Sequence, residues 1–424
     1  MIKVFKDFRV YRWLVLFVIS IAMFGNYYLY DSIAPVADNL INQLGFSQTN
    51  IGQLNTMYSI AAIIALLFGG VFIDKYGTRI SILLFGGICA VAGFVTMLTP
   101  NFYVMLLGRV LLGIGAEPLV VAATVAIAKW FKGKEIAFAM GINLMIARAG
   151  SYFANQLPSL KEEIFKNWKE PLIIASIIGC LCIVVGIIYF FLEKRGYKRF
   201  DLGKGGETDK LSLRGFFQYS RSFWLIVALC FVFYSAVFPF YSTFSFLYFQ
   251  DFHGLEKSAV GNIVRLLPLS AMFATPIIGL FVDFAGKRAT MMLFGSILIM
   301  PVFVIMSYLN INLLIPVSML GLAFSLIPAI MWPSVAYVVQ ENKLGKAYAL
   351  MTLLQQVGVA ALNWLIGHMN DSAGASSNNP NGYLPMVWVL SLLGILGLLF
   401  SIWLRSIERG PKGHGLELPS GEKV

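Results

Sequence analysis

Charged residues are scarce in this sequence. Asp, Glu, Lys and Arg make up only 12% of the 424 residues, whereas a typical soluble domain has about 25%. Hydrophobic residues account for 58% of the chain, and the mean hydropathy is +0.77. This composition excludes an ordinary soluble protein and predicts an all-α membrane protein that crosses the lipid bilayer many times.

Histidine and cysteine are also scarce, with three and four residues. So few residues supply no His/Cys cluster with metal-ligand spacing, and we expect neither a metal site nor a cofactor. No nucleophile–base set is apparent, so an enzyme is the least favoured class. The cysteines fall inside apolar runs, where we expect buried hydrophobic side chains and no disulfides: Cys89, Cys180, Cys182 and Cys230.

The net charge of +11 does not indicate a nucleic-acid partner, because the basic residues fall in loops between apolar runs. Twelve runs are long enough to span a bilayer, at about 12–37, 48–73, 80–99, 102–129, 135–157, 171–192, 222–249, 258–282, 289–309, 312–339, 346–369 and 383–404. Of the 32 Lys and Arg residues, 25 lie in loops on the side of the N-terminus and 4 on the opposite side. Since cytoplasmic loops are enriched in Lys and Arg, we predict that both termini are cytoplasmic.

One long polar segment divides the predicted spans into two groups of six. Residues 193–221 are basic and Gly-rich. We therefore predict an N-terminal six-helix bundle over 1–192, a cytoplasmic basic linker over 193–221, and a C-terminal six-helix bundle with a cytoplasmic tail over 222–424. The apolar spans suggest that a monomer suffices.

A short loop motif, G-x3-D-x2-G-x-R, occurs once in each group, after the second span. The two copies are 209 residues apart. Gly gives the backbone freedom that a tight turn needs, while Asp and Arg can tie the loop to a helix end. We predict a gating role for the Asp, the second Gly and the Arg of each copy: Asp74, Gly77 and Arg79, and Asp283, Gly286 and Arg288.

A helical hairpin over 103–156 carries one charge near the middle of each arm. Glu117 lies 15 residues before Lys132, and Arg148 lies 16 residues after it. At a rise of about 1.5 Å per residue, both charges lie roughly 23 Å from the same turn. An acid and a base are therefore predicted at one depth, near the bilayer midplane.

Two interpretations of this pair stay open. A charge at that depth costs about 2.5 to 3.5 kcal/mol on insertion scales, so intramembrane charges face a cavity or each other. Glu117 and Arg148 could form a structural ion pair between their helices. Alternatively they bind a zwitterion, with Glu117 on an ammonium and Arg148 on a carboxylate, which matches the guanidinium fork.

The duplicated loop resembles the signature of the major facilitator superfamily, and residues 109–113 resemble a second, looser signature. Residues 113–119, 130–135 and 147–151, together with Tyr30-Asp31, resemble the lysosomal dipeptide transporter family and its prokaryotic relatives. The resemblance implies the major facilitator fold, with twelve transmembrane helices in two six-helix bundles around a central cavity. It also implies uniport of dipeptides, with Glu117 engaging the amino end and Arg148 the carboxyl end.

The chain departs from the animal members in its short N-terminal tail, which has no dileucine sorting signal. We therefore expect a prokaryotic inner (plasma) membrane. Proton-coupled peptide carriers, a different family, have a glutamate-rich E-x-x-E-R motif in their first helix. The run 12–37 contains no Glu, which favours facilitated transport over proton symport.

Other polar residues within the spans are weaker candidates for substrate contact. Tyr27, Tyr30 and Asp31 share one helix face, although an interfacial aromatic belt explains them equally well. Arg109 could contact substrate, or pack against the first helix or a backbone carbonyl. Arg265 could meet an acidic substrate side chain, pair with Asp31, or snorkel. In the second group the counterparts of the charged pair are neutral, and Trp332 and Gln355 are candidates there.

These residues favour a transporter of small zwitterionic peptides that alternates between inward and outward states. The alternative is a proton-coupled carrier of other small organic solutes, or a drug antiporter, in which Glu117 is the protonation switch. Arg148 argues against that switch, because a nearby cation keeps the acid ionised. A receptor or scaffold would not need two charges at one depth.

Overall fold

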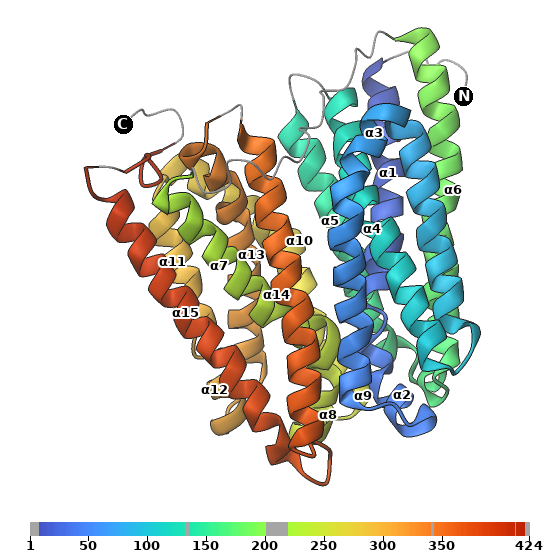
Figure 1. Ribbon diagram of the computed structural model, residues 1–424, viewed down its shortest axis with the longest axis vertical. Helices are drawn as coiled ribbons and strands as arrows, with labels where there is room; N and C mark the ends of the chain where they lie inside the picture. The colour runs from blue at the N-terminus through green and yellow to red at the C-terminus, as the bar shows by residue number, and fades with distance from the viewer. Residues whose placement is uncertain (1–7, 132–134, 201–218, 341–342, 412, 420–424) are drawn as a thin grey trace. The chain divides into compact units, whose positions relative to one another are not determined.

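The computed structural model describes residues 8–131, 135–200, 219–340, 343–411 and 413–419, and these are almost entirely helical (Figure 1). The turn at 132–134 and most of the predicted linker, residues 201–218, lie outside the described residues. The helices before that linker are α1 (Phe8–Asp31), α2 (Ala37–Leu44), α3 (Gln48–Leu98), α4 (Phe102–Trp130), α5 (Ile136–Leu160) and α6 (Lys169–Arg199). After it come α7 (Arg221–Pro239), α8 (Ser245–His253), α9 (Lys257–Val264), α10 (Leu266–Ala285), α11 (Arg288–Ile299), α12 (Val302–Tyr308), α13 (Leu314–Val338), α14 (Leu344–Ser372) and α15 (Leu384–Glu408).

Within the described residues, ten helical runs are long and apolar enough to cross a membrane. One of them, α3, is 51 residues long and contains the second and third predicted spans. Its backbone leaves the helical region at Gly77, with φ 77° and ψ 165°, a conformation that favours glycine. The fifth predicted span corresponds to α5, which is not one of the ten runs. The chain therefore has the expected helical membrane architecture, while the count of twelve stays a prediction.

Three of the predicted spans are not continuous helices in the structure. The span 222–249 is interrupted by a π-turn at Phe240–Phe244, directly after Pro239. The span 258–282 breaks between α9 and α10, four residues before Pro268, and a proline crowds the carbonyl four residues earlier in a helix. The span 289–309 breaks before Pro301. Pro276, Pro328 and Pro333 lie inside α10 and α13.

Local sequence explains where some helices begin. The side chain of Asn101 accepts hydrogen bonds from the backbone N–H groups of Tyr103 and Val104 at the start of α4. Ser220 accepts in the same way from the N–H of Phe223 at the start of α7. Such N-caps satisfy backbone donors that have no partner within the helix. They therefore define the residue at which α4 and α7 each begin.

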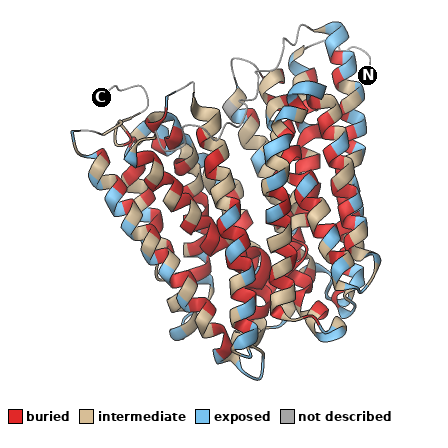
Figure 2. Cartoon of the chain, in the orientation of Figure 1, coloured by how far each residue is buried: buried red, intermediate tan, exposed pale blue. Residues whose placement is uncertain are grey.

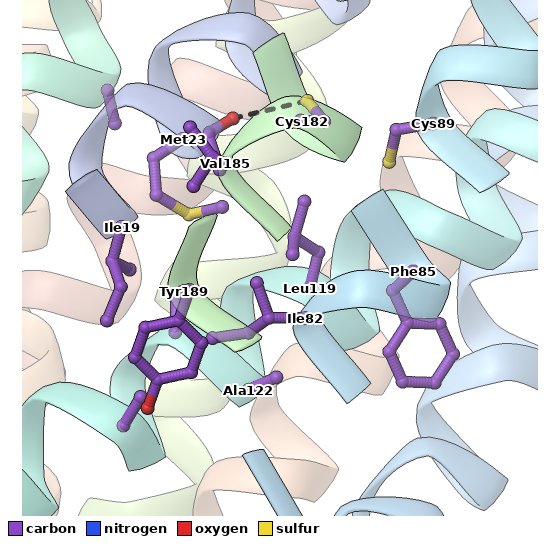
Figure 3. Packing of buried hydrophobic residues seen from close by; sticks show 14 of the residues in the cluster. Ile19, Met23, Ile82, Phe85, Cys89, Leu119, Ala122, Cys182, Val185 and Tyr189 are labelled. Carbon is purple, nitrogen blue, oxygen red and sulfur yellow. Dashed lines mark hydrogen bonds between the residues drawn. The ribbon is translucent and has the colours of Figure 1, made fainter. Parts of the chain in front are cut away.

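The chain divides into two compact units. The first comprises Met1–Gly45, Met57–Leu157 and Lys161–Lys210, and the second comprises Phe46–Thr56, Pro158–Leu160 and Leu211–Val424. In the first unit α1 packs against α4 and α6. Figure 3 shows its core, in which Ile19, Met23, Phe85, Leu119 and Val185 come together from four helices. In the second unit α13 packs against α10 and α11, and α7 packs against α14 and α15.

Large apolar side chains also cover the exposed faces of the helices, which are pale blue in Figure 2. Among them are Phe17, Phe68, Phe273, Leu280, Phe284 and Trp403, each more than half exposed. Exposed apolar surface of this extent marks contact with lipid or another apolar partner. Together with the length of the helices, it identifies an integral membrane protein.

The cysteines do not all occupy the predicted environment. Cys89, Cys182 and Cys230 are buried free thiols, as expected, and the Sγ of Cys182 donates to the carbonyl of Ala22 at 3.3 Å (Figure 3). Cys180 is exposed, so its predicted burial was wrong. Because successive helical residues are 100° apart, Cys180 faces outward when Cys182, two positions later, faces the core.

Candidate substrate site

The last two turns of α1 carry the three residues that we expected on one face. Tyr27 and Tyr30 are half-buried, whereas Asp31 is only 2% exposed and is the last residue of the helix. Asp31 is therefore enclosed within the first unit, and both tyrosines pack against its core.

Tyr27 lies near both charged residues of the hairpin. The guanidinium carbon of Arg148, on α5, lies 5.3 Å from the centre of the Tyr27 ring, a cation–π distance. The Tyr27 phenol is also close enough to Glu117 and Asp31 to interact with their charges. Glu117 and Arg148 are both half-buried. The structure thus brings Tyr27, Asp31, Glu117 and Arg148 into one cluster within the first unit.

Two glycines allow the helices that carry this cluster to approach closely. A Cβ atom on Gly113 of α4 would lie 2.2 Å from the carbonyl oxygen of Tyr58 on α3. A Cβ atom on Gly150 of α5 would lie 2.2 Å from the carbonyl oxygen of Phe24 on α1. Real Cβ atoms do not approach so closely, so only glycine fits at either position. Each glycine lies within four residues of a charged member of the cluster, and the contact sets where that charge lies.

Tyr58 is a site residue that the sequence analysis missed. Its hydroxyl donates to Oε1 of Glu117 at 3.1 Å, and its ring lies 4.7 Å from that of Tyr30 at an interplanar angle of 60°. The available signal was modest: Tyr58 is the one tyrosine in the apolar run 48–73. Nothing in its spacing pointed to Glu117, which is 59 residues away.

Arg109 binds the end of α1, as one of its two interpretations expected. It is 1% exposed, and its two terminal nitrogens donate to the carbonyls of Leu29 and Tyr30, each at 3.2 Å. Its guanidinium carbon also lies 5.5 Å from the centres of both the Tyr30 and Tyr58 rings. Arg109 is therefore held among α1, α3 and α4.

The remaining candidates belong to the second unit. The indole of Trp332 donates to the hydroxyl of Tyr234 at 3.1 Å and stacks on Tyr348 at 6.1 Å between ring centres. Gln355 is half-buried, with its Oε1 3.9 Å from the Sγ of Cys230. Arg265 is half-buried at the junction of α9 and α10. A substrate contact for these three residues stays a prediction.

The two copies of the repeated loop are held by different contacts. In the first copy Asp74 and Gly77 are exposed, and Arg79 lies over the ring of Phe190 at 4.7 Å. Thr78 donates to Oε1 of Glu193 at 2.8 Å. The same carboxylate oxygen binds the Nζ of Lys129 at 2.6 Å, so this loop is anchored to α4 and α6.

In the second copy Arg288 pairs with Asp283 of the same motif at 3.0 Å and lies 4.2 Å from the ring centre of Tyr337. Gly286 has φ +67°. The backbone N–H of Arg288 donates to the carbonyl of Leu416 at 2.7 Å, so the C-terminal segment 413–419 is bound to this loop. The Asp and Arg of the motif therefore pair with each other here. Its gating role stays a prediction.

The family is shown by comparison with known proteins. The model of the Major Facilitator Superfamily matches residues 19–362, and the chain belongs to that superfamily. A solved structure of a bacterial homologue of the human lysosomal transporter Spinster, in an inward-facing and unoccupied conformation, aligns with a TM-score of 0.73 at 15% identity. The alignment covers 93% of this chain and 97% of that one. The chain is therefore a membrane transporter with the major facilitator fold, and not an enzyme.

Two similar proteins are named for the substrates that they transport. The lysosomal dipeptide transporter MFSD1 of Danio rerio is 28% identical over 382 residues, which is 86% of this chain and 82% of that protein. The hexuronate transporter of Bacillus subtilis (strain 168) is 22% identical over 371 residues, covering 83% of this chain and 86% of that protein.

Proposed function

We propose that this protein is a facilitator of small zwitterionic peptides, with dipeptides as its substrates. Glu117 binds the amino end of the peptide and Arg148 binds the carboxyl end. The observation that carries the proposal is the cluster around Tyr27, because it joins one acid and one base, both half-buried, on adjacent helices. The similarity to a dipeptide transporter over most of the chain supports it.

The charges of the cluster suit a zwitterion. Asp31 and Glu117 are acidic, while Arg109 and Arg148 are basic, and Asp31 is close enough to Arg109 to interact with its charge. The four side chains carry no net charge together. A zwitterion adds one charge of each sign, so no proton or counter-ion is required to keep the site neutral. This balance favours uniport over proton coupling.

The dimensions suit a short peptide. Successive residues of an extended chain advance about 3.3 to 3.6 Å, and packed helices have axes about 8 to 10 Å apart. The long side chains of Glu117 and Arg148 can therefore reach the two ends of a dipeptide from neighbouring helices. The Tyr27 and Tyr30 hydroxyls supply hydrogen-bonding groups for the peptide amide.

A second candidate is a proton-coupled carrier of another small organic solute, such as a hexuronate. The similarity to the hexuronate transporter supports it. In that case Arg148 binds the sugar carboxylate, and Glu117 takes up a proton. An anionic sugar has no ammonium group, so this candidate leaves Glu117 without a cationic partner on the substrate.

The proposal also covers the setting in which the protein acts. The protein acts as a monomer in a prokaryotic inner membrane, with both termini in the cytoplasm. It alternates between inward and outward states by movement of one half against the other, and the repeated loops at Asp74 and Asp283 control that movement.

Flux into liposomes tests the proposal. Purified protein is reconstituted, and uptake of labelled alanyl-alanine or of labelled glucuronate is measured with and without a proton gradient. Unlabelled glucuronate serves as a competitor of the dipeptide, and Arg148→Ala is the inactive control. We expect uptake that equilibrates without a gradient and does not respond to glucuronate. Gradient-driven accumulation of the dipeptide would refute uniport, and uptake of glucuronate but not dipeptide would establish the second candidate.

A further inference from the structure

A continuous series of contacts runs from Arg109 to Glu117 by way of two tyrosines. Arg109 and Glu117 are eight residues apart on α4, or about 12 Å along the helix axis. Arg109 lies against the rings of Tyr30 and Tyr58, those rings contact each other, and the Tyr58 hydroxyl binds Glu117. A buried cation is thus linked to the acid that we assign to the amino end of the substrate.

The first link is the end of α1. The last four carbonyls of a helix accept no backbone hydrogen bond within the helix. The helix dipole also gives that end a partial negative charge. Since α1 ends at Asp31, the carbonyls of Leu29 and Tyr30 are among those four. Arg109 donates to both. The two terminal nitrogens of a planar guanidinium can bind two adjacent carbonyls in this way, whereas the single nitrogen of a lysine ammonium cannot.

The second link is the pair of rings. The guanidinium carbon of Arg109 lies at 5.5 Å from both ring centres, so one cation attracts the faces of two aromatic side chains. Arg109 is 1% exposed and Tyr58 is 5% exposed, so both side chains are enclosed by neighbouring residues. The Tyr58 ring is therefore held in the orientation that directs its hydroxyl at Glu117.

We propose that Tyr58 is a specificity-determining residue for the amino end of the substrate, and that Arg109 is a positioning residue that acts through Tyr58. The proposal rests on the proposed function. An ionised carboxylate has about four acceptor positions, so Glu117 accepts a hydrogen bond from Tyr58 and from a substrate ammonium together. Tyr58 fixes the position of the Glu117 carboxylate. A charged ammonium gains binding free energy from a carboxylate in that position, whereas an acetylated, uncharged nitrogen gains little.

The experiment measures discrimination at each end of the ligand. Apparent affinities for alanyl-alanine, its N-acetyl form and its C-terminal amide are obtained from thermal shifts of the purified protein and of Tyr58→Phe and Arg109→Lys. A hydrogen bond to a charged group is worth about tenfold or more in affinity. We expect Tyr58→Phe to reduce the preference for the free over the acetylated peptide about tenfold, and Arg109→Lys to reduce it in the same direction. The preference for the free carboxylate over the amide is unchanged in both.

Matched controls separate positioning from general damage. Tyr28→Phe removes a hydroxyl from a buried tyrosine of the same core, and Arg221→Lys makes the same exchange at an exposed position; both keep full discrimination. Equal loss of preference at both ends, or full retention of the amine preference in Tyr58→Phe, would overturn the proposal. If Arg109→Lys does not fold, Tyr58→Phe decides alone, since it keeps the ring. Failure of the unaltered protein to distinguish free from acetylated peptide would instead overturn the assignment of Glu117 to the amino end, and this inference with it.

Discussion

Gly150 of α5 lies directly against the carbonyl of Phe24 on α1. A Cβ atom at position 150 would lie 2.2 Å from that oxygen and 3.1 Å from the backbone nitrogen of Tyr28. Arg148 is two residues before Gly150, and Tyr27 is three residues after Phe24, so this backbone contact sets the separation of Arg148 and Tyr27. The two helices can come this close because residue 150 is a glycine and has no Cβ atom.

We predict that Gly150→Ala weakens substrate binding and lowers stability, because the added carbon meets backbone and not a mobile side chain. Overpacking of this kind costs about 1 to 3 kcal/mol. The thermal midpoint and dipeptide affinity of the purified variant measure both effects. Gly141→Ala is the matched control, since a Cβ atom there meets nothing within 4 Å. Equal behaviour of the two variants would contradict the role assigned to the contact.

The pair formed by Lys129 and Glu193 supports a second prediction. The two side chains are 6% and 2% exposed, and Thr78 of the repeated loop donates to the same carboxylate oxygen. Removing one partner of a buried pair costs about 3 to 5 kcal/mol, because the other charge is left buried. We predict a loss of that order in Glu193→Gln, measured by thermal or denaturant unfolding in detergent.

Two further variants test the cause of that loss. Glu170→Gln removes an exposed carboxylate near the start of α6 and should leave the midpoint unchanged. The double variant Lys129→Met, Glu193→Gln should recover part of the lost stability, since no buried charge is left. A double variant less stable than Glu193→Gln would show that burial of the lysine charge is not the cause.

The third prediction concerns the C-terminal segment 413–419. The carboxylate of Glu417 accepts from the backbone N–H and the hydroxyl of Thr290, at 2.8 and 2.7 Å, in the first turn of α11. It thus caps α11 from outside the helix. Loss of a helix cap costs about 1 kcal/mol, whereas the 3.6 Å pair of Glu417 with the exposed Arg409 contributes little.

We therefore predict that Glu417→Gln lowers the thermal midpoint slightly and speeds amide hydrogen exchange at the start of α11, with no change in the middle of α13. Glu163→Gln, an exposed carboxylate of the first unit, is the control. Unaltered exchange at 288–291 would show that the cap does not stabilise α11.

The sequence predicted features that depend on local spacing. The apolar runs predicted a helical membrane protein, and the repeated loop motif predicted the superfamily whose model matches the chain. Tyr58 was missed because its contact with Glu117 joins residues 59 positions apart. That contact depends on the close approach of α3 and α4 at Gly113, which no periodicity reveals.

Helix continuity was only partly predictable, for a physical reason. Proline removes a backbone donor and crowds the carbonyl four residues earlier, but the result depends on whether neighbouring groups satisfy the freed carbonyl. Pro239 is followed by a π-turn, and α9 ends four residues before Pro268, whereas Pro328 and Pro333 lie inside α13. The difference lies in tertiary surroundings that the sequence does not show.

The last prediction tests whether Glu117 and Arg148 bind the two ends of one ligand. A free dipeptide offers each of them an opposite charge. A peptide with one blocked end leaves one of the two residues without its ionic partner on the ligand, and a half-buried charge without that partner binds the ligand less tightly. We expect free dipeptides to raise the thermal midpoint of the purified protein, and N-acetylated or C-amidated forms to raise it far less.

Variants at the two positions should respond differently. Glu117→Gln keeps the shape of the side chain but not its charge, so it should lose the requirement for a free amine while it still requires a free carboxylate. Arg148→Ala removes the fork that matches the carboxylate and should abolish stabilisation by every form. Arg221→Ala, at an exposed position, should leave all responses intact. Equal stabilisation of the unaltered protein by blocked and free peptides would mean that the two charges serve the structure alone and that the substrate binds elsewhere.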